Sequence, residues 1–403
     1  GPRVAGYNPI KLARWLRATG GAPSLAGHDP VGQILLIKHR CPDVYERTHA
    51  FVEPGDFLTA RMTGRIVAAA ESATACWGTD NRKIDAIQYD DRLLRLAGLE
   101  RTKLPEIVPS GSVVGELLPE RAAELGIEPV PVVASTPDIM SAAAGSGAVA
   151  DNAAHLYVGT SGWLSCHVPY KKTDPFHNIA TLPSPIPGRY LVCTEQQCAG
   201  ATLAHLRDNL LGTPRTSFDD LVAEAAAVPA GADGVIFTPW LNGERTPLDD
   251  NHVRAAYANI SLTTTRGALV RATLEGVACN VRWMRHYTEK LVKRRLDSIA
   301  LIGGGAESPL WCQIFADVLD REIRRIDAPR HANTRGAALL ASAALGHIGF
   351  SEIPDRVRTA ETFTPNAANR ALYDELFDEF RGFYKANRKL YARINGKAKE
   401  SGR

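Results

Sequence analysis

The sequence predicts an α/β fold, and two observations carry that prediction. From about Ala153 to about Gly349, strand-like runs alternate regularly with helix-like runs of amphipathic spacing. Within this part, two turns of small residues each follow a strand-like run: Gly159 to Gly162, and Gly303 to Ala306. A chain of 403 residues also has ample material for a large core and suggests two or three domains.

Composition is that of an ordinary globular protein, with 45% hydrophobic and 23% charged residues and a net charge of +3. The basic runs 290–295 and 385–399 lie beside amphipathic helical patterns, so solvated helix faces are favoured over a nucleic-acid surface. No apolar run approaches the roughly 20 residues of a membrane helix, and no signal peptide is visible. We expect no nucleic-acid or membrane partner and a cytoplasmic location.

Cysteine usage supports the same expectation. The seven cysteines make an odd count with irregular spacing, and most of them lie in apolar segments, as core thiols in a reducing compartment do. The sequence contains no CxxC pair and no Cys/His cluster, so a structural zinc site is not indicated.

The first third of the chain has weaker patterns. We expect the following elements: helical segments over 10–30, 32–40, 90–96 and 121–125, an apolar run over 50–58, and a connector punctuated by Pro105, Pro109 and Gly111. In the C-terminal tail, Tyr373, Phe377 and Phe380 recur at helical spacing within 366–391. This stripe predicts a packed helix, which we expect to dock back across the lobes.

Asp138 follows a strand-like run, from Val130 to Ala134, that ends at Thr136-Pro137. A helix of small residues begins there and places Asp138 in its first turn. The helix dipole favours a carboxylate at this position by ~0.5 kcal/mol, so a purely structural role is one interpretation of this residue. A role in chemistry is the other.

The turn Gly159-Thr160-Ser161-Gly162 joins two strand-like runs. Such a turn presents several backbone N–H groups and two hydroxyls to one point in space, which suits a phosphate group. Taken alone it is more often a plain hairpin.

Two more segments combine a strand, a turn and a helix. One passes from Tyr190 through Ala199-Gly200-Ala201 into an amphipathic helix. The other passes from Ile299 through the Gly303 to Ala306 turn into a helix with Trp311 and Phe315 on one face. A turn without side chains lets a flat or anionic ligand approach the backbone at a helix N-terminus.

Three common nucleotide or hydrolase motifs are excluded. The run 145–150, GSGAVA, imitates a dinucleotide fingerprint, but it follows a helix and precedes a strand, which is the reverse of the required order. The sequence has no GxxxxGK[ST] loop. Ser161 is not in a GxSxG elbow, because residue 163 is Trp.

Seven motifs in fixed order resemble the FGGY family of carbohydrate kinases, closest to its xylulokinase branch: PDIMSAA, YVGTSGW, AGATLAHLRD, FTPWLNGERTP, LVRATLEGVA, IGGGAESPLWCQIFADVL and RGAALLASAALG. The resemblance covers nearly the whole chain. It implies an actin-like or hexokinase-like fold of two lobes, each built on a ribonuclease-H-like βββαβαβα core, with ATP and sugar between them. Residues 1–150 would then be the remainder of an N-terminal sugar-binding lobe, and residues 151–403 a C-terminal nucleotide-binding lobe with a terminal helix.

The resemblance also implies that the first lobe is incomplete, because an N-terminal segment with a first phosphate loop precedes the corresponding point in such kinases. Three positions depart from the family. Ile139 stands where Asn or Gln is usual, Pro309 replaces an Asn, and Asn259 replaces a Gly. Which sugar is the substrate therefore stays open.

The resemblance assigns roles to particular residues. Asp138 would be the catalytic base and would also contact the sugar and Mg²⁺, and Tyr7 would contact the sugar. The phosphates of ATP would lie on Gly159, Thr160, Ser161 and Gly200, and the adenosine on Gly304, Gly305, Ala306 and Ser308. Glu244, Arg245 and Thr246 would either brace a loop or contact a ligand.

The implied reaction is ATP-dependent phosphorylation of a small ketose such as xylulose, or of a polyol, with Mg²⁺ as the metal. The partners would be the sugar and ATP, and a homodimer stays open. The alternative is an inactive actin-like nucleotide-binding module, or a kinase fragment.

Overall fold

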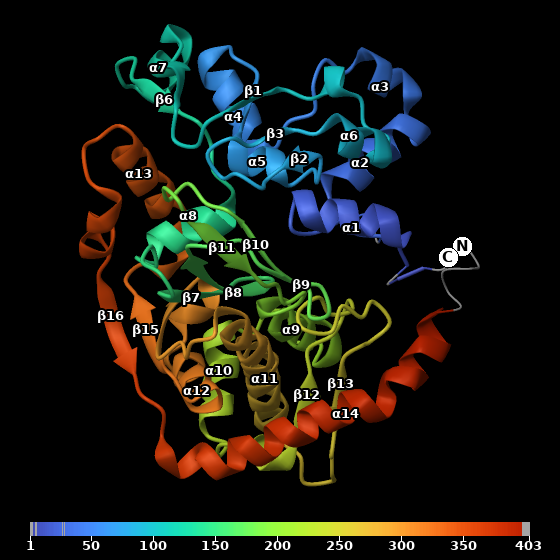
Figure 1. Cartoon of the computed structure of the whole chain (residues 1–403). Coiled ribbons are helices and arrows are strands. Elements are labelled where there is room, and N and C mark those ends of the chain that lie inside the picture. The colour runs from blue at the N-terminus through green and yellow to red at the C-terminus, as the bar shows by residue number, and fades with distance from the viewer. Residues whose placement is uncertain (1–2, 5, 26, 28, 397–403) are drawn as a thin grey trace.

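The computed structural model describes residues 3–4, 6–25, 27 and 29–396. An N-terminal region lies above a larger C-terminal region built on one broad sheet (Figure 1). Across the described residues, no helix is both long and apolar enough to cross a lipid bilayer.

The large sheet has eight strands in the order β16-β15-β14-β7-β8-β11-β10-β9. Its centre consists of β7 (Ala154–Val158), β8 (Gly162–Val168), β11 (Tyr190–Cys193), β14 (Ser298–Ile302) and β15 (Glu322–Ile326). The pairs β7–β8 and β8–β11 are antiparallel, whereas β7–β14 and β14–β15 are parallel. Three antiparallel strands followed by two parallel strands, each reached through a helix, form the succession expected of a ribonuclease-H-like core.

Short strands widen this sheet at both edges. β9 (Thr173–Asp174) and β10 (Ile179–Pro183) extend the side of β11, and β16 (Thr359–Phe363) pairs antiparallel with β15. A separate ribbon of β12 (Ile236–Thr238) and β13 (Ala256–Ala258) packs against the helices below.

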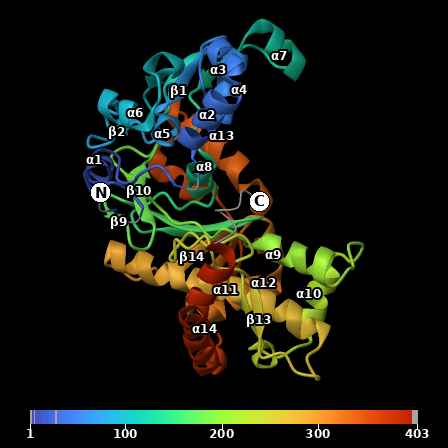
Figure 2. The same cartoon turned by 90° about the vertical axis from the view of Figure 1, so that its right-hand side faces the viewer.

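Helices cover both faces of the sheet. On one face lie α11 (Arg266–Val292) and α12 (Pro309–Leu319), which share a continuous apolar core with β7, β8 and β14. On the other face lie α8 (Asp138–Gly145) and α13 (Ala332–Ala344) (Figures 1 and 2). The sheet is therefore buried on both sides, as its run of buried residues in β7 and β8 requires.

The C-terminal tail forms α14 (Arg370–Gly396), and its expected stripe is buried: Tyr373, Phe377 and Phe380. Phe380 and Tyr384 make edge-on contacts with Trp240 and Trp283 of the C-terminal region. The helix runs along the bottom of that region (Figure 1), so the expectation that it docks across both lobes was wrong. Its aromatic partners all lie on the C-terminal side.

The N-terminal region consists of short helices and two-stranded sheets. The helices are α1 (Pro9–Ala18), α2 (Pro30–Arg40), α3 (Pro42–Arg47), α4 (Pro54–Thr63), α5 (Ala70–Thr74), α6 (Asp91–Ala97) and α7 (Pro119–Leu125). The strands pair as β1 (Val67–Ala69) with β4 (Glu106–Val108), β2 (Thr79–Asp80) with β3 (Gln88–Tyr89), and β5 (Val113–Glu116) with β6 (Pro131–Val133). Within the described part of this region no sheet exceeds two strands.

Helix α1 ends earlier than its polar helical pattern suggests. Asn8 caps its start by accepting hydrogen bonds from the N–H groups of Ile10 and Lys11. Gly20 has a φ of 93°, which ends the helical backbone just beyond Ala18. A small core around Trp15 then joins α1, α2, α3 and α6.

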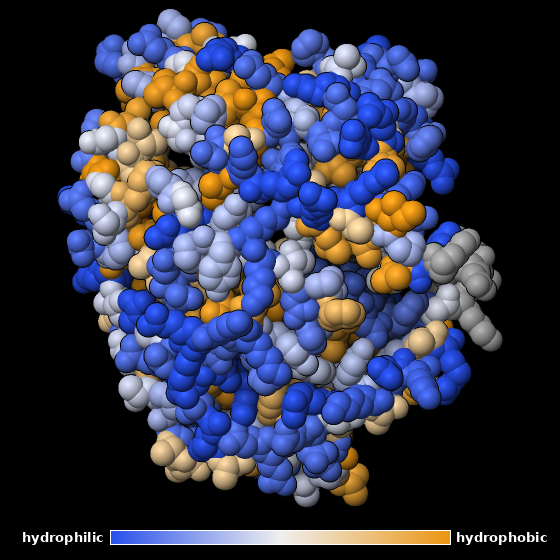
Figure 3. Space-filling model, viewed as in Figure 1, coloured by the Kyte–Doolittle hydropathy of each residue, from blue (hydrophilic) through white to orange (hydrophobic). Residues whose placement is uncertain are grey.

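The surface is hydrophilic over much of the face in Figure 3, with apolar patches over the N-terminal region. Exposed apolar side chains of this region include Phe57 and Leu58 of α4 and Leu125 of α7. The division at residue 150 stays a prediction. Helix α8, which precedes that boundary, packs on the sheet of the C-terminal region.

Candidate active site

Two turns lie at the carboxyl ends of two central strands of the large sheet, β7 and β14. Because β7 and β14 are parallel neighbours, with Tyr157 opposite Ile302, the turns that follow them lie side by side. Gly303 approaches β7 so closely that a Cβ atom there would lie 2.5 Å from the Val158 carbonyl oxygen, and its φ of 90° also requires glycine. The sheet thus joins the two segments that the sequence singled out separately.

The Gly159-Thr160-Ser161 turn is held by the start of α9 (Gly200–His205). The Gly159 carbonyl accepts from Gly200 N–H at 2.8 Å, and the Thr160 carbonyl accepts from Ala199 and Ala201 N–H at 2.9 and 3.1 Å. Among the described residues, the N–H and hydroxyl groups of Thr160 and Ser161 have no hydrogen-bond partner. This is more than a plain hairpin, because these donors stay available while the carbonyls of the turn already accept hydrogen bonds within the protein.

Gly200 contributes to this turn by close approach. A Cβ atom at Gly200 would lie 2.6 Å from the Gly159 carbonyl oxygen, so any larger residue would push the turn away. Its own N–H is already used within the protein. A contact of Gly200 with a phosphate stays a prediction, and it would have to be made without that N–H.

Glu244 braces the segment behind the turn. It is fully buried, and its Oε1 accepts from the N–H groups of Gln197 and Arg245, each at 2.8 Å. Its Oε2 accepts from Asn280 Nδ2 at 3.1 Å, and Asn280 is oriented by the indole N–H of Trp240. Desolvation raises the pKa of Glu244 to about 8, although these donors favour the charged form.

The segment held by Glu244 is connected to the turn by one further pair of residues, Gln196 and Gly162. Gln196 and Gly162 exchange two backbone hydrogen bonds, at 2.7 and 3.1 Å, directly after Ser161. Arg245 is ion-paired with Glu195, and the Thr246 hydroxyl donates to the Asn178 carbonyl. For the motif 244–246, these contacts are those of loop bracing, which is one of the two interpretations that the sequence left open.

The second turn is only partly open to a ligand. Gly305 faces inward, where a Cβ atom would lie 2.4 Å from Val158 Cγ1, and Ala306 is fully buried. Ser308 caps α12 by accepting from Trp311 N–H at 3.2 Å. Adenosine contacts by Gly305, Ala306 and Ser308 stay predictions. Each of these residues also stabilises the turn or the start of α12.

Gly304 is the outward member of the same turn. A Cβ atom there would meet only the Arg330 guanidinium, at 3.8 Å. Arg330 is exposed and paired with Glu307 at 2.5 Å. The sequence did not single out Arg330, because only the parallel strands β14 and β15 bring it over the turn.

Asp138 lies exposed at the first position of α8, and its Oδ1 accepts from Ile139 N–H at 2.7 Å. Burial and the nearby Asp138 carboxylate raise the pKa of Tyr157. The hydroxyl of Tyr157 lies against Gly159, 2.4 Å from where a Cβ atom would be. The charge of Asp138 therefore acts on a hydroxyl that lies against the first turn.

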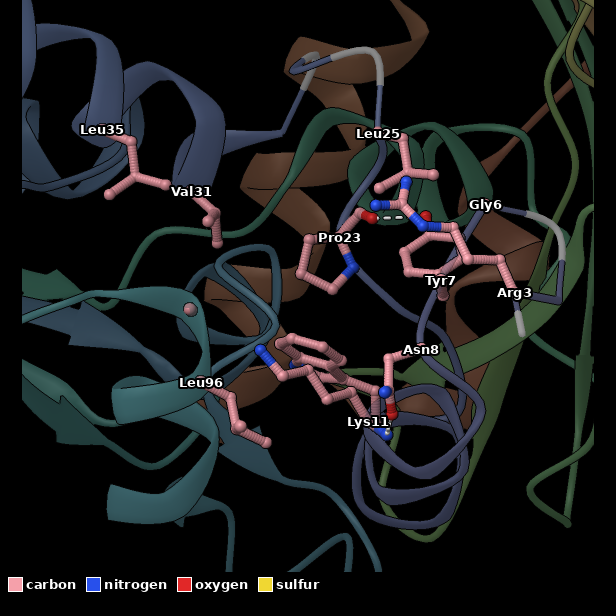
Figure 4. A pocket seen from close by; sticks show the side chains of 12 residues that line it. Arg3, Gly6, Tyr7, Asn8, Lys11, Pro23, Leu25, Val31, Leu35 and Leu96 are labelled. Atoms are coloured by element: carbon pink, nitrogen blue, oxygen red, sulfur yellow. Dashed lines mark hydrogen bonds between the residues drawn. The ribbon is translucent and has the colours of Figure 1, made fainter. Parts of the chain in front are cut away.

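Tyr7 lies elsewhere. Its hydroxyl donates to the Pro23 carbonyl at 2.5 Å, and it lines a cavity of about 460 Å³ together with Asn8, Lys11 and Trp15 (Figure 4). Asp138 and the two turns do not line this cavity. A sugar contact by Tyr7 stays a prediction, and the structure does not bring it together with Asp138.

Two family models match the sequence of this chain. The N-terminal domain of the FGGY family of carbohydrate kinases matches residues 16–145, and the C-terminal domain of that family matches residues 155–345. The chain belongs to the FGGY family of carbohydrate kinases. As a member of that family it is an ATP-dependent sugar kinase, and the resemblance read from the seven motifs is confirmed.

Individual relatives support the same placement. The chain is 28% identical over 367 residues to the xylulose kinase of Staphylococcus epidermidis, covering 89% of this chain and 72% of the relative. It is 27% identical over 358 residues to the Bacillus subtilis xylulose kinase, covering 87% and 70%. The gluconokinase of Bacillus licheniformis is 24% identical over 375 residues, covering 91% and 72%.

Solved structures are similar as well. The xylulose kinase from Rhodospirillum rubrum superimposes with a TM-score of 0.79 at 26% identity, covering 94% of this chain and 76% of that one. The ligand-bound xylulose kinase from Lactobacillus acidophilus gives a TM-score of 0.82 at 23% identity, covering 95% and 76%. These likenesses confirm the two-lobe α/β fold.

Proposed function

We propose that this protein transfers the terminal phosphoryl group of ATP to a hydroxyl group of a small ketose such as xylulose, or of a polyol. One juxtaposition carries the proposal: a turn whose donors have no partner among the described residues lies beside a second glycine turn on the neighbouring parallel strand, and the Asp138 charge acts on Tyr157 against the first turn. A transferable phosphoryl group needs these parts together, namely a base, donors for its charge and a place for the nucleotide.

Asp138 is proposed as the base. In phosphoryl transfer the sugar oxygen attacks the terminal phosphorus while its proton passes to a carboxylate. Asp138 is exposed at the first position of α8, and its charge acts on Tyr157, whose hydroxyl lies against the first turn. The exposure of Asp138 supports the role, because a substrate can reach an exposed carboxylate.

The nucleotide is proposed to lie across the two turns. The N–H and hydroxyl groups of Thr160 and Ser161, which have no partner among the described residues, suit the terminal phosphates. Gly304 leaves room for the adenosine, and Arg330 stands over it as a cation next to the phosphates.

Mg²⁺ fits this site in the way it usually binds nucleotides. It is commonly held by one or two carboxylates together with substrate phosphates and waters, rather than by a full protein cage. The described residues include no group of three or more His, Cys, Asp or Glu side chains able to hold a metal, and Asp138 offers a single exposed carboxylate. Asp138 would hold the ion, which would neutralise phosphate charge when bound with ATP.

The cytoplasm is the proposed location. All seven cysteines are free thiols, and five of them are buried, which suits a reducing compartment.

A coupled assay for ADP formation tests the proposal, with D-xylulose, D-gluconate and glycerol as candidate acceptors. We expect turnover on at least one acceptor and none without an acceptor. ATP binding without turnover on any acceptor would contradict the proposal and favour the inactive nucleotide-binding module.

A further inference from the structure

Tyr157 has a fixed ring at the centre of the site. It is the fourth residue of β7, and its ring stacks on Trp163 with centroids 4.0 Å apart and planes 10° apart. Trp163 is itself held by its indole N–H, which donates to His155 Nε2 at 3.2 Å. The phenol packs against the core formed by Ala142 of α8 and Ile302 of β14. This packing sets the direction of its hydroxyl.

The hydroxyl of Tyr157 lies against Gly159, the first residue of the Gly159-Thr160-Ser161 turn. Measured from an ideal Cβ at Gly159, the Tyr157 oxygen lies at 2.4 Å and its Cε1 at 2.5 Å, so the edge of the phenol covers the Gly159 Cα. The side chain is partly exposed, and within the described part of the chain its hydroxyl has no hydrogen-bond partner. A fixed phenol with a free O–H group is a ready donor.

Asp138 is near enough for its charge to act on this hydroxyl. Burial first, and then the charge of the Asp138 carboxylate, raise the pKa of Tyr157. The phenol therefore keeps its proton at neutral pH and can donate, but it cannot act as a base.

We propose that the Tyr157 hydroxyl donates a hydrogen bond to the phosphoryl group as it passes from ATP to the sugar, at the Gly159 turn. This inference rests on the proposed function. In the step, the sugar oxygen bonds to the terminal phosphorus, its proton goes to Asp138, and the bond to the bridging oxygen breaks with its electron pair leaving on ADP. Tyr157 retains its proton throughout and stabilises the oxygens that carry the charge.

The test is Tyr157→Phe, which removes one oxygen and keeps the ring on Trp163. We expect kcat for the best sugar to fall about tenfold to a hundredfold, as the loss of one donor to a charged group does. The affinity for ATP relative to ADP, measured by calorimetry, should fall at least about threefold, because only ATP carries the terminal phosphate. The melting temperature should stay within a degree or two.

Tyr170→Phe is the matched control. It also removes a single tyrosine hydroxyl near β8, but that hydroxyl is directed to the Val292 carbonyl, 3.4 Å away, beyond the opposite end of the strand. We expect this variant to keep the wild-type kcat and the wild-type ratio of ATP to ADP affinity.

The two readouts separate this inference from the proposed function. If Tyr157→Phe keeps both kcat and the affinity ratio, the inference is overturned. If the wild type phosphorylates no sugar but Tyr157→Phe loses the preference for ATP, the proposed function fails while the contact with the terminal phosphate is supported. If the wild type neither turns over nor distinguishes ATP from ADP, both are overturned.

Discussion

At the scale of single residues, the hydrogen bonds already formed within the protein determine which atoms of the site can bind a ligand. The carbonyls of Gly159 and Thr160 accept hydrogen bonds from the start of α9, whereas the N–H and hydroxyl groups of Thr160 and Ser161 have no partner in the described part of the chain. Asp138 shows the same division, since one carboxylate oxygen accepts the N–H of Ile139 while the side chain stays exposed. An acidic residue at the start of a helix can therefore also be available to act as a base.

Asp138→Asn separates the two roles of this residue. We expect kcat to fall roughly a hundredfold or more, because a positioned base contributes about that much, while the affinity for ATP measured without Mg²⁺ changes little. Steady-state kinetics and calorimetry measure the two quantities. Asp219→Asn is the control, because Asp219 is also an exposed acid in a first helical turn, that of α10 (Phe218–Ala226), and loses only the dipole interaction. Retention of most activity by Asp138→Asn would place the base elsewhere.

At the scale of elements, the crossing of α8 and α13 decides where Asp138 lies. The two helices touch through glycines: a Cβ atom at Gly145 would lie 1.8 Å from the Ala332 carbonyl oxygen, and one at Gly336 would lie 1.8 Å from that of Ser141. Because the two backbones are in direct contact, no flexible side chain could move aside to make room for an added Cβ atom. The helix that carries Asp138 is thus pinned to the helix that follows β15.

Gly145→Ala and Gly336→Ala should each destabilise the protein by about 1–3 kcal/mol, the usual cost of overpacking, and should lower activity by moving α8. Urea denaturation measures the first effect. Gly382→Ala is the matched control, because Gly382 lies in the interior of α14 and a Cβ atom there meets only Glu379 Oε2, at 4.0 Å. It should stabilise α14 by roughly 0.5–1 kcal/mol, since alanine is the better helix former. Equal effects at all three glycines would refute the close crossing.

At the scale of the whole molecule, the large sheet encloses two histidines as neutral groups. His155 accepts from Trp163, and His167 contacts the Ala148 carbonyl and the Ser184 hydroxyl, each at 2.9 Å. Burial lowers the pKa of His155 to about 3 and that of His167 to about 4. Both side chains lie in β7 and β8, so their protonation would disturb the sheet that holds both turns.

The free energy of unfolding should therefore fall as the pH falls below about 6.5. The unfolded histidines take up protons there, and the folded ones do not until about pH 4 and about pH 3, so each costs about 2 kcal/mol by pH 5. Glu244 acts in the opposite direction, because its pKa is raised in the folded state. Glu244 is present in the wild type and in each histidine variant, so its contribution cancels when the proteins are compared.

Urea denaturation at pH 7 and pH 5 makes that comparison. The loss of stability between the two values should shrink by about 2 kcal/mol in His167→Gln and stay unchanged in His39→Gln, since His39 is exposed on α2. A wild-type loss that His167→Gln leaves intact would contradict the expectation.

By itself the sequence determined the α/β class, the buried stripe of α14, and the family. These follow from periodicity and from residues that act locally, such as Gly303, whose turn requires a left-handed backbone. The regular alternation of strand and helix predicted from about Ala153 is wrong for the first part of that range, because β7 to β11 follow one another with no helix between them. The opening segment was the weakest part, because the helix that its polar pattern suggested over 10–30 ends at Ala18, where Gly20 follows.

Only the tertiary structure decided which way each residue of a turn faces. Gly304 and Gly305 are alike in sequence, yet one faces Arg330 and the other Val158, because β7 lies beside β14. Tyr157 lies against Gly159, whereas Tyr7 lines a cavity that neither Asp138 nor the two turns line. Local patterns specify backbone conformation, whereas the neighbours of a side chain depend on strand register and helix packing between segments far apart in the chain.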